Sequence, residues 1–171
     1  MISTKSRSDL LIQIDSREHR WERARIEMQL ARLGVKTITS KCYVGDYLLW
    51  ENPRRVVDRK GSLLELCSNC CQQHERFRRE LLRARDAGIQ LIILVEEDGI
   101  ETLEDVYWWD NPRLAKSPKA VTGQALYRSL CTIRDRYGVE FAFCSKLETG
   151  KKILELLKNG YEKGQGLDKA P

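Results

Sequence analysis

The chain has 171 residues, 42% of them hydrophobic and 32% charged, a balance that fits one ordinary globular domain with a sizeable core. No apolar run reaches membrane-spanning length, and the first residues lack the apolar stretch of a signal peptide, so we expect an intracellular protein without a membrane partner. The net charge of +5 is mild and by itself weak support for a nucleic-acid partner. Six cysteines in such a chain indicate reduced thiols.

The first third of the chain predicts a strand, a helix and an extended segment. "LLIQID" (10–15) is typical of a short buried strand that ends in an acid. Residues 21–33 predict a helix that stops at Gly34. Its apolar residues form two sets at helical spacing, Trp21, Ala24, Met28 and Ala31 in one and Ile26, Leu30 and Leu33 in the other. The β-branched residues of "VKTITSKCYV" predict an extended segment.

Two strands and two helices are expected next. "DYLLW" and "RRVVDRK" predict strands joined through "ENP" as a hairpin. "SLLELCSN" begins a helix, and residues 74–87 predict a second one with Phe77, Leu81 and Ala84 on its inner side. That second helix is basic, with five arginines against three acids over residues 74–88.

The remainder alternates in the same way. "IQLIILVEE" is an unbroken apolar run, typical of a strand covered on both faces. The acidic, aromatic residues 98–120 predict an irregular insertion, followed by a helix over 122–137, the strand "VEFAFCS" and a closing helix over 149–158. This alternation predicts an α/β fold, a three-layer α/β/α sandwich around a central mixed sheet. We expect one domain over residues 8–160 and a flexible tail over 161–171.

Charged residues within the predicted hairpin raise the question of function. Residues i and i+2 of a strand share a face, so Asp58 and Lys60 lie together, with Arg59 on the other side. Pairing of the two hairpin strands brings Asp46 toward Asp58. Two carboxylates are the ligands that Mg²⁺ or Mn²⁺ needs, and such a metal activates water for phosphodiester hydrolysis while a lysine stabilises the developing negative charge. A further acidic cluster, Asp15 and Glu18, follows the first strand.

"IDSRE", "VGDYLL" and "VVDRK", in this order, resemble the nuclease domain of XPF-type structure-specific endonucleases, within the PD-(D/E)XK superfamily. The likeness continues through residues 76–97 and 126–157 and so covers most of residues 10–158. It implies a restriction-endonuclease-like fold and metal-dependent cleavage of branched, flapped or forked DNA, in repair or recombination, often by a dimer.

Matching motifs imply the site residues. Asp46 and Asp58 are expected to be metal ligands together with the backbone carbonyl of Arg59, and Lys60 to be the catalytic lysine. Asp15 and Glu18 are expected in the same site, with Asp15 as a further candidate ligand. The arginines expected to contact DNA are Arg17, Arg59, Arg76, Arg79 and Arg83. On the basic helix, Glu75, Glu80 and Asp86 offer the alternative that the arginines form ion pairs on a solvated face.

The chain departs from the family pattern in three places. Asp58 stands where the family usually has Glu, and Leu64 stands where it has a further Asp, with Glu65 as a neighbouring candidate. We expect no helix-hairpin-helix module after the nuclease segment, which leaves open whether the domain works alone, as a homodimer or with a separate DNA-binding partner. A non-catalytic DNA-binding or scaffold subunit on the same fold is therefore the competing interpretation.

Two other features favour ordinary roles. Cys67, Cys70, Cys71 and His74 are zinc-ligand types at close spacing, but zinc sites generally pair two such groups and no second one exists, so packing is favoured over zinc binding. Trp108 and Trp109 lie among acids that repel phosphate, which favours a core or interface role over base stacking. The sequence leaves open a cytoplasmic, nucleoid-associated, viral or mobile-element setting.

Overall fold

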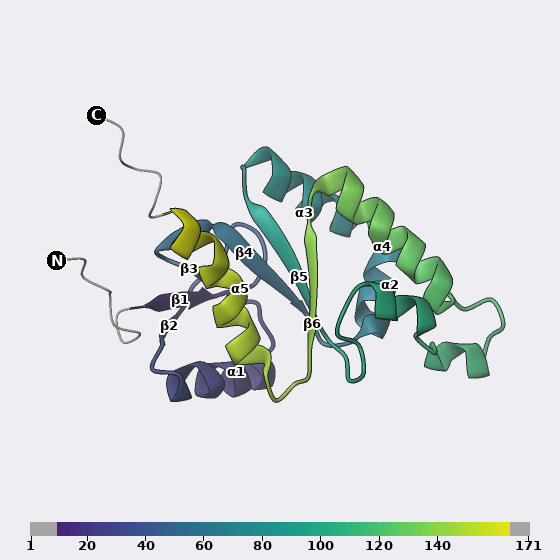
Figure 1. Ribbon diagram of the computed structural model, residues 1–171, viewed down its shortest axis with the longest axis horizontal. Helices are drawn as coiled ribbons and strands as arrows, with labels where there is room; N and C mark the ends of the chain where they lie inside the picture. Colours follow the sequence, from purple (N-terminus) through teal and green to yellow (C-terminus); the bar gives the residue numbers. More distant parts are fainter. Residues whose placement is uncertain (1–9, 165–171) are drawn as a thin grey trace. The chain divides into compact units, whose positions relative to one another are not determined.

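The computed structural model describes residues 10–164, and its elements follow the order expected from the sequence (Figure 1). The strands are β1 (Leu11–Ile14), β2 (Lys36–Thr39), β3 (Tyr47–Leu49), β4 (Asn52–Lys60), β5 (Gln90–Glu96) and β6 (Glu140–Cys144). The α-helices are α1 (Arg20–Arg32), α2 (Leu63–Cys71), α3 (His74–Asp86), α4 (Gly123–Tyr137) and α5 (Thr149–Gly164). Two short 3-10 helices, η2 (Glu104–Trp108) and η3 (Pro112–Ala115), lie between β5 and α4.

The strands form one mixed sheet in the order β2-β1-β3-β4-β5-β6. The β1–β2 and β5–β6 pairs are parallel, whereas β1–β3 and β3–β4 are antiparallel. The predicted α/β fold around a central mixed sheet is therefore confirmed. The hairpin connection is tighter than predicted, because Asn52 and Pro53 already belong to β4.

By its contacts the chain divides into two compact units, which are described separately. The first contains the residues up to Asp58 together with those from Leu147 onward, and the second contains Arg59–Lys146. The division falls within β4. The first unit therefore carries the acids Asp15, Asp46 and Asp58, and the second carries Arg59 and Lys60.

In the first unit α1 and α5 lie side by side (Figure 1). Of the two apolar sets expected on α1, only the second is used, with Ile26 and Leu30 fully buried. The expectation that Trp21 and Met28 form an inner stripe is wrong, since Trp21 is 73% exposed and Met28 is also exposed. Helical spacing alone cannot decide between two overlapping stripes, because the choice depends on where the neighbouring helix lies.

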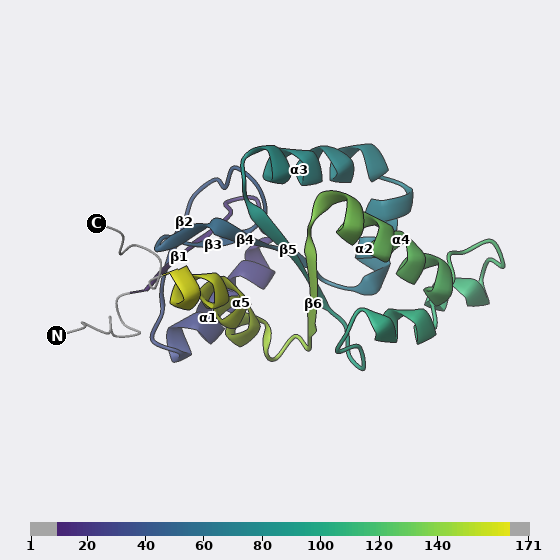
Figure 2. The same cartoon turned by 45° about the horizontal axis from the view of Figure 1, so that its top comes forward.

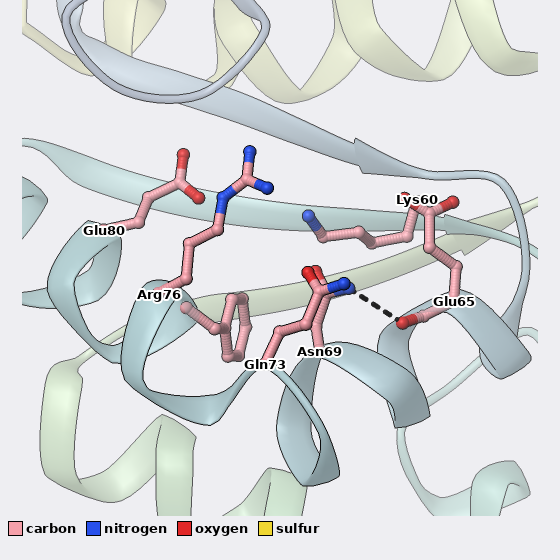
Figure 3. A pocket seen from close by; sticks show the side chains of 7 residues that line it. Lys60, Glu65, Asn69, Gln73, Arg76 and Glu80 are labelled. Atoms are coloured by element: carbon pink, nitrogen blue, oxygen red, sulfur yellow. Dashed lines mark hydrogen bonds between the residues drawn. The ribbon is translucent and has the colours of Figure 1, made fainter.

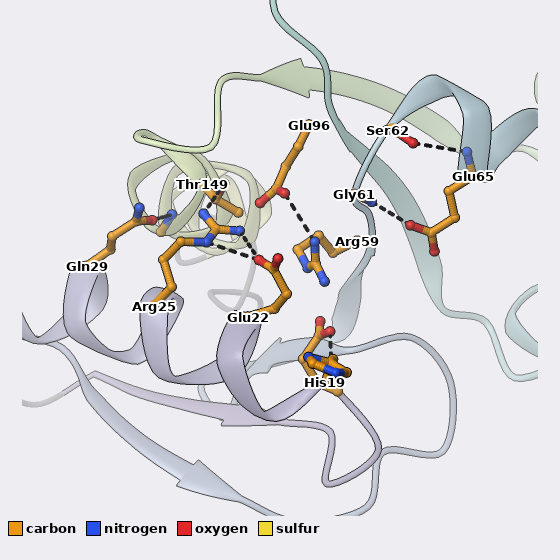
Figure 4. A network of polar contacts seen from close by, with 12 residues as sticks. His19, Glu22, Arg25, Gln29, Arg59, Gly61, Ser62, Glu65, Glu96 and Thr149 are labelled. Carbon is orange, nitrogen blue, oxygen red and sulfur yellow. Dashed lines mark hydrogen bonds and ion pairs between the residues drawn. The ribbon is translucent and has the colours of Figure 1, made fainter.

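Polar contacts fasten these two helices to each other and α5 to the sheet (Figure 4). The Arg25 guanidinium donates to Thr149 Oγ1 at 3.2 Å, and the Gly150 N–H donates to Gln29 Oε1 at 2.6 Å. From β4, Asn52 Nδ2 donates to the Leu157 carbonyl at 2.9 Å and Arg55 Nε to the Leu156 carbonyl at 2.6 Å. Main-chain carbonyls of α5 are thus paired with side chains of β4.

The second unit is built on the parallel pair β5–β6 (Figure 2). Residues 91–96 are all buried, as the unbroken apolar run predicted, and α2 and α3 pack against β5. On α3 the inward residues are Phe77, Leu81 and Ala84, which confirms the predicted stripe. Helix α4 begins after Thr122, whose side chain accepts the Ala125 N–H, and ends at Gly138 in the left-handed conformation.

The acidic segment before α4 packs through a few apolar residues. Leu103 and Val106 are buried, and η2 contacts α4 at Gly123, where a Cβ atom would approach the Trp109 carbonyl to 2.5 Å. Trp108, in contrast, is 79% exposed. A core role for Trp108 is therefore wrong, and an interface role stays a prediction.

The closing helix is longer than its apolar pattern indicates. It continues to Gly164, so residues 161–164 of the predicted tail are helical, and residues 165–171 lie outside the described part. None of the helices within residues 10–164 has the length and apolar character needed to cross a membrane.

Candidate active site

Gly45 sets the position of Asp46 in the first unit. Its φ of +67° lies in the left-handed region, and a Cβ atom there would meet Val56 Cγ1 at 2.5 Å. The close approach lets the Asp46 N–H donate to the Val57 carbonyl at 2.9 Å. Since Tyr47 is also paired with Val57, Asp46 and Asp58 lie at the same end of the β3–β4 pair.

Asp15 joins this end from the neighbouring strand. Its N–H donates to the Asp46 carbonyl at 2.7 Å, which continues the antiparallel pairing of β1 with β3. Asp15 follows β1, Asp46 precedes β3 and Asp58 lies within β4, so three acids of adjacent strands lie at one edge of the first unit. Asp46 is partly exposed, whereas Asp15 and Asp58 are buried.

The Asp15 carboxylate is engaged by the loop around it. It accepts hydrogen bonds from Arg17 Nε and Nη2, both at 2.8 Å, and from the backbone N–H groups of Arg17 and Cys42, both at 2.7 Å. Burial by itself would raise the pKa of Asp15, but these hydrogen bonds and the Arg17 charge lower it below its usual value. Asp15 thus organises residues 15–17 and 42, and the 59% exposed Arg17 side chain is held beside it.

This pairing gives a pH-dependent stability. A carboxyl whose pKa is lowered in the folded protein stabilises the fold at every pH above its ordinary pKa, near 3.8. This contribution is lost as the pH falls through the lower pKa of the folded state. We expect Asp15→Asn to lower the free energy of unfolding by roughly 1–3 kcal/mol at pH 7. The difference from the wild type should shrink below about pH 4.

Urea denaturation of both proteins from pH 7 down to about pH 2.5 measures this dependence. The matched control is Asp98→Asn, an exposed acid, for which we expect a change within about 0.5 kcal/mol. A difference between wild type and Asp15→Asn that stays constant across the whole range would contradict the pairing.

Glu18 is also tied to the strands. Its Oε2 accepts the hydroxyl of the fully buried Tyr47 at 3.0 Å, and its Oε1 accepts the His19 N–H at 3.1 Å. Glu18 therefore links the segment after β1 to β3, the strand that follows Asp46. His19 itself is exposed.

Lys60 is buried in the second unit, with 7% of its surface exposed. Its ammonium lies 5.7 Å from the centre of the Phe77 ring, within the range of a cation–π contact. Around it opens a cavity of about 150 Å³ with polar walls from α2, α3 and the residue before α3 (Figure 3). Besides Lys60 and Phe77, the cavity is lined by Glu65, Asn69, Gln73, Arg76 and Glu80.

Arg59 has a partner that the sequence did not suggest. Its Nη1 lies 3.1 Å from Glu96 Oε2, and the two side chains are 7% and 0% exposed (Figure 4). The only sequence signal for Glu96 was an acid at the end of an unbroken apolar strand, the same kind of signal that singled out Asp15. A DNA contact by Arg59 stays a prediction, since its guanidinium forms a buried ion pair.

Glu65, the candidate for the acid missing at Leu64, forms a capping box at the start of α2. Its N–H donates to Ser62 Oγ at 3.1 Å, and its Oε2 accepts the Gly61 N–H at 2.7 Å (Figure 4). The carboxylate thus has a local structural role. Its replacement of the missing acid stays a prediction.

The predicted DNA-contacting arginines of α3 are all exposed. Arg76, Arg79 and Arg83 recur at three- and four-residue spacing and so share one side of the helix. The alternative of ion pairs among the arginines and acids of this helix is met in one case, because Asp86 lies 3.3 Å from Arg85, whereas Glu75 lies 3.6 Å from His74.

Of the α2 cysteines Cys67 is buried, Cys70 half-buried and Cys71 exposed. Burial, first of all, and neighbouring thiols raise the pKa of Cys70 to about 12 and of Cys67 to about 11, so both are protonated at neutral pH. Within residues 10–164, no three His, Cys, Asp or Glu side chains are grouped so that they could hold a metal ion. Zinc binding at this cluster thus gains no support, and a metal at the acidic edge would need ligands from water and substrate besides the carboxylates.

The mixed α/β sheet and the acids of its adjacent strands agree with the nuclease-domain resemblance of the sequence motifs. Residues 14–157 match the ERCC4 domain, and the chain belongs to that family. This confirms the XPF-type nuclease resemblance seen in the motifs.

Two solved structures share the fold, both of XPF from Aeropyrum pernix. One is 19% identical with a TM-score of 0.63 and is matched over 92% of this chain and 68% of its own. The other, a complex with DNA, is 20% identical with a TM-score of 0.63, over 90% of this chain and 66% of its own. No curated protein matches the chain significantly.

Proposed function

We propose that this chain is a Mg²⁺- or Mn²⁺-dependent DNA endonuclease acting on branched, flapped or forked DNA. The observation that carries the proposal is the placement of Asp46 and Asp58 at one end of paired strands. Lys60 follows Asp58 by two residues in the same strand, so the covalent geometry of β4 keeps the lysine near the acids. Membership of the ERCC4 domain family supports the assignment.

The donor set fits a hard divalent cation. Asp46 and Asp58 would supply carboxylate oxygens, the Arg59 backbone carbonyl a further oxygen and Asp15 a candidate fourth ligand. Mg²⁺ usually keeps several waters and shares its remaining positions with substrate phosphate, so two carboxylates suffice. When bound, such an ion supplies Lewis acidity and lowers the pKa of a coordinated water.

The protein side chains would then handle charge and position. In hydrolysis a water oxygen bonds to phosphorus and one P–O ester bond breaks, leaving a phosphate on one fragment and a hydroxyl on the other. The Lys60 ammonium would stabilise the negative charge that develops on the phosphate oxygens. Glu18 would hold the acidic edge in place through Tyr47, and Arg17, Arg59, Arg76, Arg79 and Arg83 would contact the DNA backbone.

The substrate and setting rest on the family likeness. The similar XPF from Aeropyrum pernix has been seen in a complex with DNA, which supports DNA as the partner here. We propose action inside the cell, in repair or recombination, by a homodimer or together with a separate DNA-binding partner.

The test is incubation of the purified protein with flapped, forked and linear DNA. We expect cleavage of a branched substrate in Mn²⁺ or Mg²⁺ and none in EDTA. Linear duplex should be cut more slowly or not at all. The proposal is overturned if none of the three substrates is cleaved at any concentration of Mn²⁺ or Mg²⁺.

A non-catalytic DNA-binding or scaffold subunit is the second candidate. It is favoured by Leu64 in place of the family acid and by the capping role of Glu65. Calorimetric titration with Mn²⁺ separates the two, with Asp46→Asn as the control. Heat of binding that the substitution removes supports the nuclease, whereas the scaffold predicts no such difference.

A further inference from the structure

We propose that the polar cavity beside Lys60 binds the DNA phosphate adjacent to the one that is cleaved. This inference deepens the proposed function and rests on it. The cavity, about 150 Å³ in volume, lies wholly within the second unit, between the end of β4 and the helices α2 and α3. Its ligand would be the phosphate group of a nucleotide within a DNA strand.

The charges in the cavity fit an anion. Figure 3 shows Lys60 from β4 and Arg76 from α3 extending toward each other across it. An anion placed between two cations is attracted by both. Arginine binds phosphate through two parallel hydrogen bonds, so Arg76 would hold the neighbouring phosphate, and the Lys60 ammonium, a point charge, would lie between this phosphate and the cleaved one.

The two acids of the cavity do not oppose this assignment. One Glu65 oxygen accepts the Gly61 N–H at 2.7 Å and so serves the start of α2. Glu80 is four residues after Arg76 on the same helix, a spacing at which a carboxylate can orient a guanidinium. Glu65 therefore has a role at the start of α2, and Glu80 has the spacing to orient Arg76.

The neutral residues of the cavity also suit phosphate better than a base. Gln73 precedes α3, and its side chain makes no capping hydrogen bond to the helix. Asn69 is anchored through its Nδ2 on the Glu65 carbonyl at 3.0 Å. Phe77 is buried beneath Lys60, so no aromatic face is open for stacking, whereas the positive end of α3 favours negative charge.

The position of Lys60 connects the cavity to the proposed cleavage site. Lys60 stands two residues after Asp58 in β4, whereas Arg76 lies on α3. A strand whose scissile phosphate approaches Asp58 would thus bring its neighbouring phosphate toward Lys60, which shares the cavity with Arg76. This assignment separates Arg76 from Arg79 and Arg83, which share its side of the helix but do not line the cavity.

The test couples a protein substitution to the removal of a single phosphate charge. A series of forked DNAs is prepared, each with a single uncharged methylphosphonate at a different position. Fluorescence anisotropy measures their binding to wild type, Arg76→Gln and Arg78→Gln in EDTA. We expect one position at which the methylphosphonate weakens wild-type binding roughly 10-fold. In Arg76→Gln the same methylphosphonate should have no further effect. Arg78→Gln, an equal charge loss on the same helix outside this cavity, should retain the 10-fold effect.

A second variant tests the cavity by another route. Gln73→Glu places a negative charge at the same cavity, so it should weaken binding of the all-phosphate DNA but not of the DNA neutralised at that position. Thermal unfolding of each variant shows that the fold is retained, as expected for these exposed residues.

The outcomes separate this inference from the nuclease assignment. If the fold-change in binding caused by Arg76→Gln is independent of the fold-change caused by the methylphosphonate at every position, the phosphate site is overturned. This holds even if the wild type cleaves DNA. Coupling at one position without cleavage in Mn²⁺ would support the site and contradict the nuclease. If added inorganic phosphate alone abolishes the effect of the methylphosphonate at that position, the cavity binds a free anion and not a phosphate of the strand. That result would also overturn the proposed phosphate site.

Discussion

Replacing Asp46 or Asp58 by asparagine is expected to lower the single-turnover cleavage rate by more than about 100-fold, since even outer partners of metal ligands commonly cost 10- to 100-fold. Asparagine keeps the size of the side chain and removes only the charge. Gly45 and the Asp46 N–H contact to Val57 hold the backbone, so the position of residue 46 should survive the substitution. The loss should therefore reflect metal binding and not misfolding.

Single-turnover assays with Mn²⁺ and a forked substrate measure this effect. Circular dichroism and thermal unfolding report whether the fold is intact, and Asp98→Asn is the matched control because Asp98 is exposed and far from the acidic edge in sequence. The assignment fails if either asparagine variant cleaves within a few fold of wild type. DNA affinity in EDTA should change little, because the metal is absent there.

Breaking the buried Arg59–Glu96 ion pair is expected to destabilise the second unit by roughly 3–5 kcal/mol, because one charge is left buried without its partner. Both Arg59→Met and Glu96→Leu should show this loss. The double substitution Arg59→Met with Glu96→Leu removes both charges and should recover a large part of the stability, since apolar residues of similar volume are often neutral replacements for a buried pair.

Chemical denaturation of the two single variants and the double variant forms a mutant cycle that isolates the pair. The recovery in the double variant is the decisive result, because it distinguishes a lost partner from a lost packing contact. If Arg59 acts chiefly on DNA, Arg59→Met would instead weaken DNA binding with unfolding free energy close to that of wild type. That pattern would contradict the structural role inferred from the 3.1 Å contact.

Element type was predictable wherever one periodicity was clear. The unbroken apolar run of β5 and the single stripe Phe77, Leu81 and Ala84 of α3 were both confirmed. Prediction failed where the local pattern was ambiguous or absent. Helix α1 has two overlapping stripes and buries one, and Trp108 in the acidic segment is exposed instead of buried.

For the candidate site, local patterns predicted the residues but not the residues that they contact. Motif order pointed to Asp46, Asp58 and Lys60, because alternation along a strand and a short hairpin are local properties of the chain. The partners of the predicted residues were not foreseeable. Arg59 meets Glu96, 37 residues away, and Asp15 accepts the N–H of Cys42, 27 residues away.

By itself the sequence determined the order of strands and helices, the family and the acids of one strand edge, since these depend on spacing within short segments. Only the tertiary structure decided which stripe of α1 is buried, that Glu65 caps α2, and that Lys60 shares a polar cavity with Arg76. The physical reason is that burial, ion pairing and cavities are made by residues from separate segments. Their meeting depends on how the helices pack on the sheet, which no local pattern specifies.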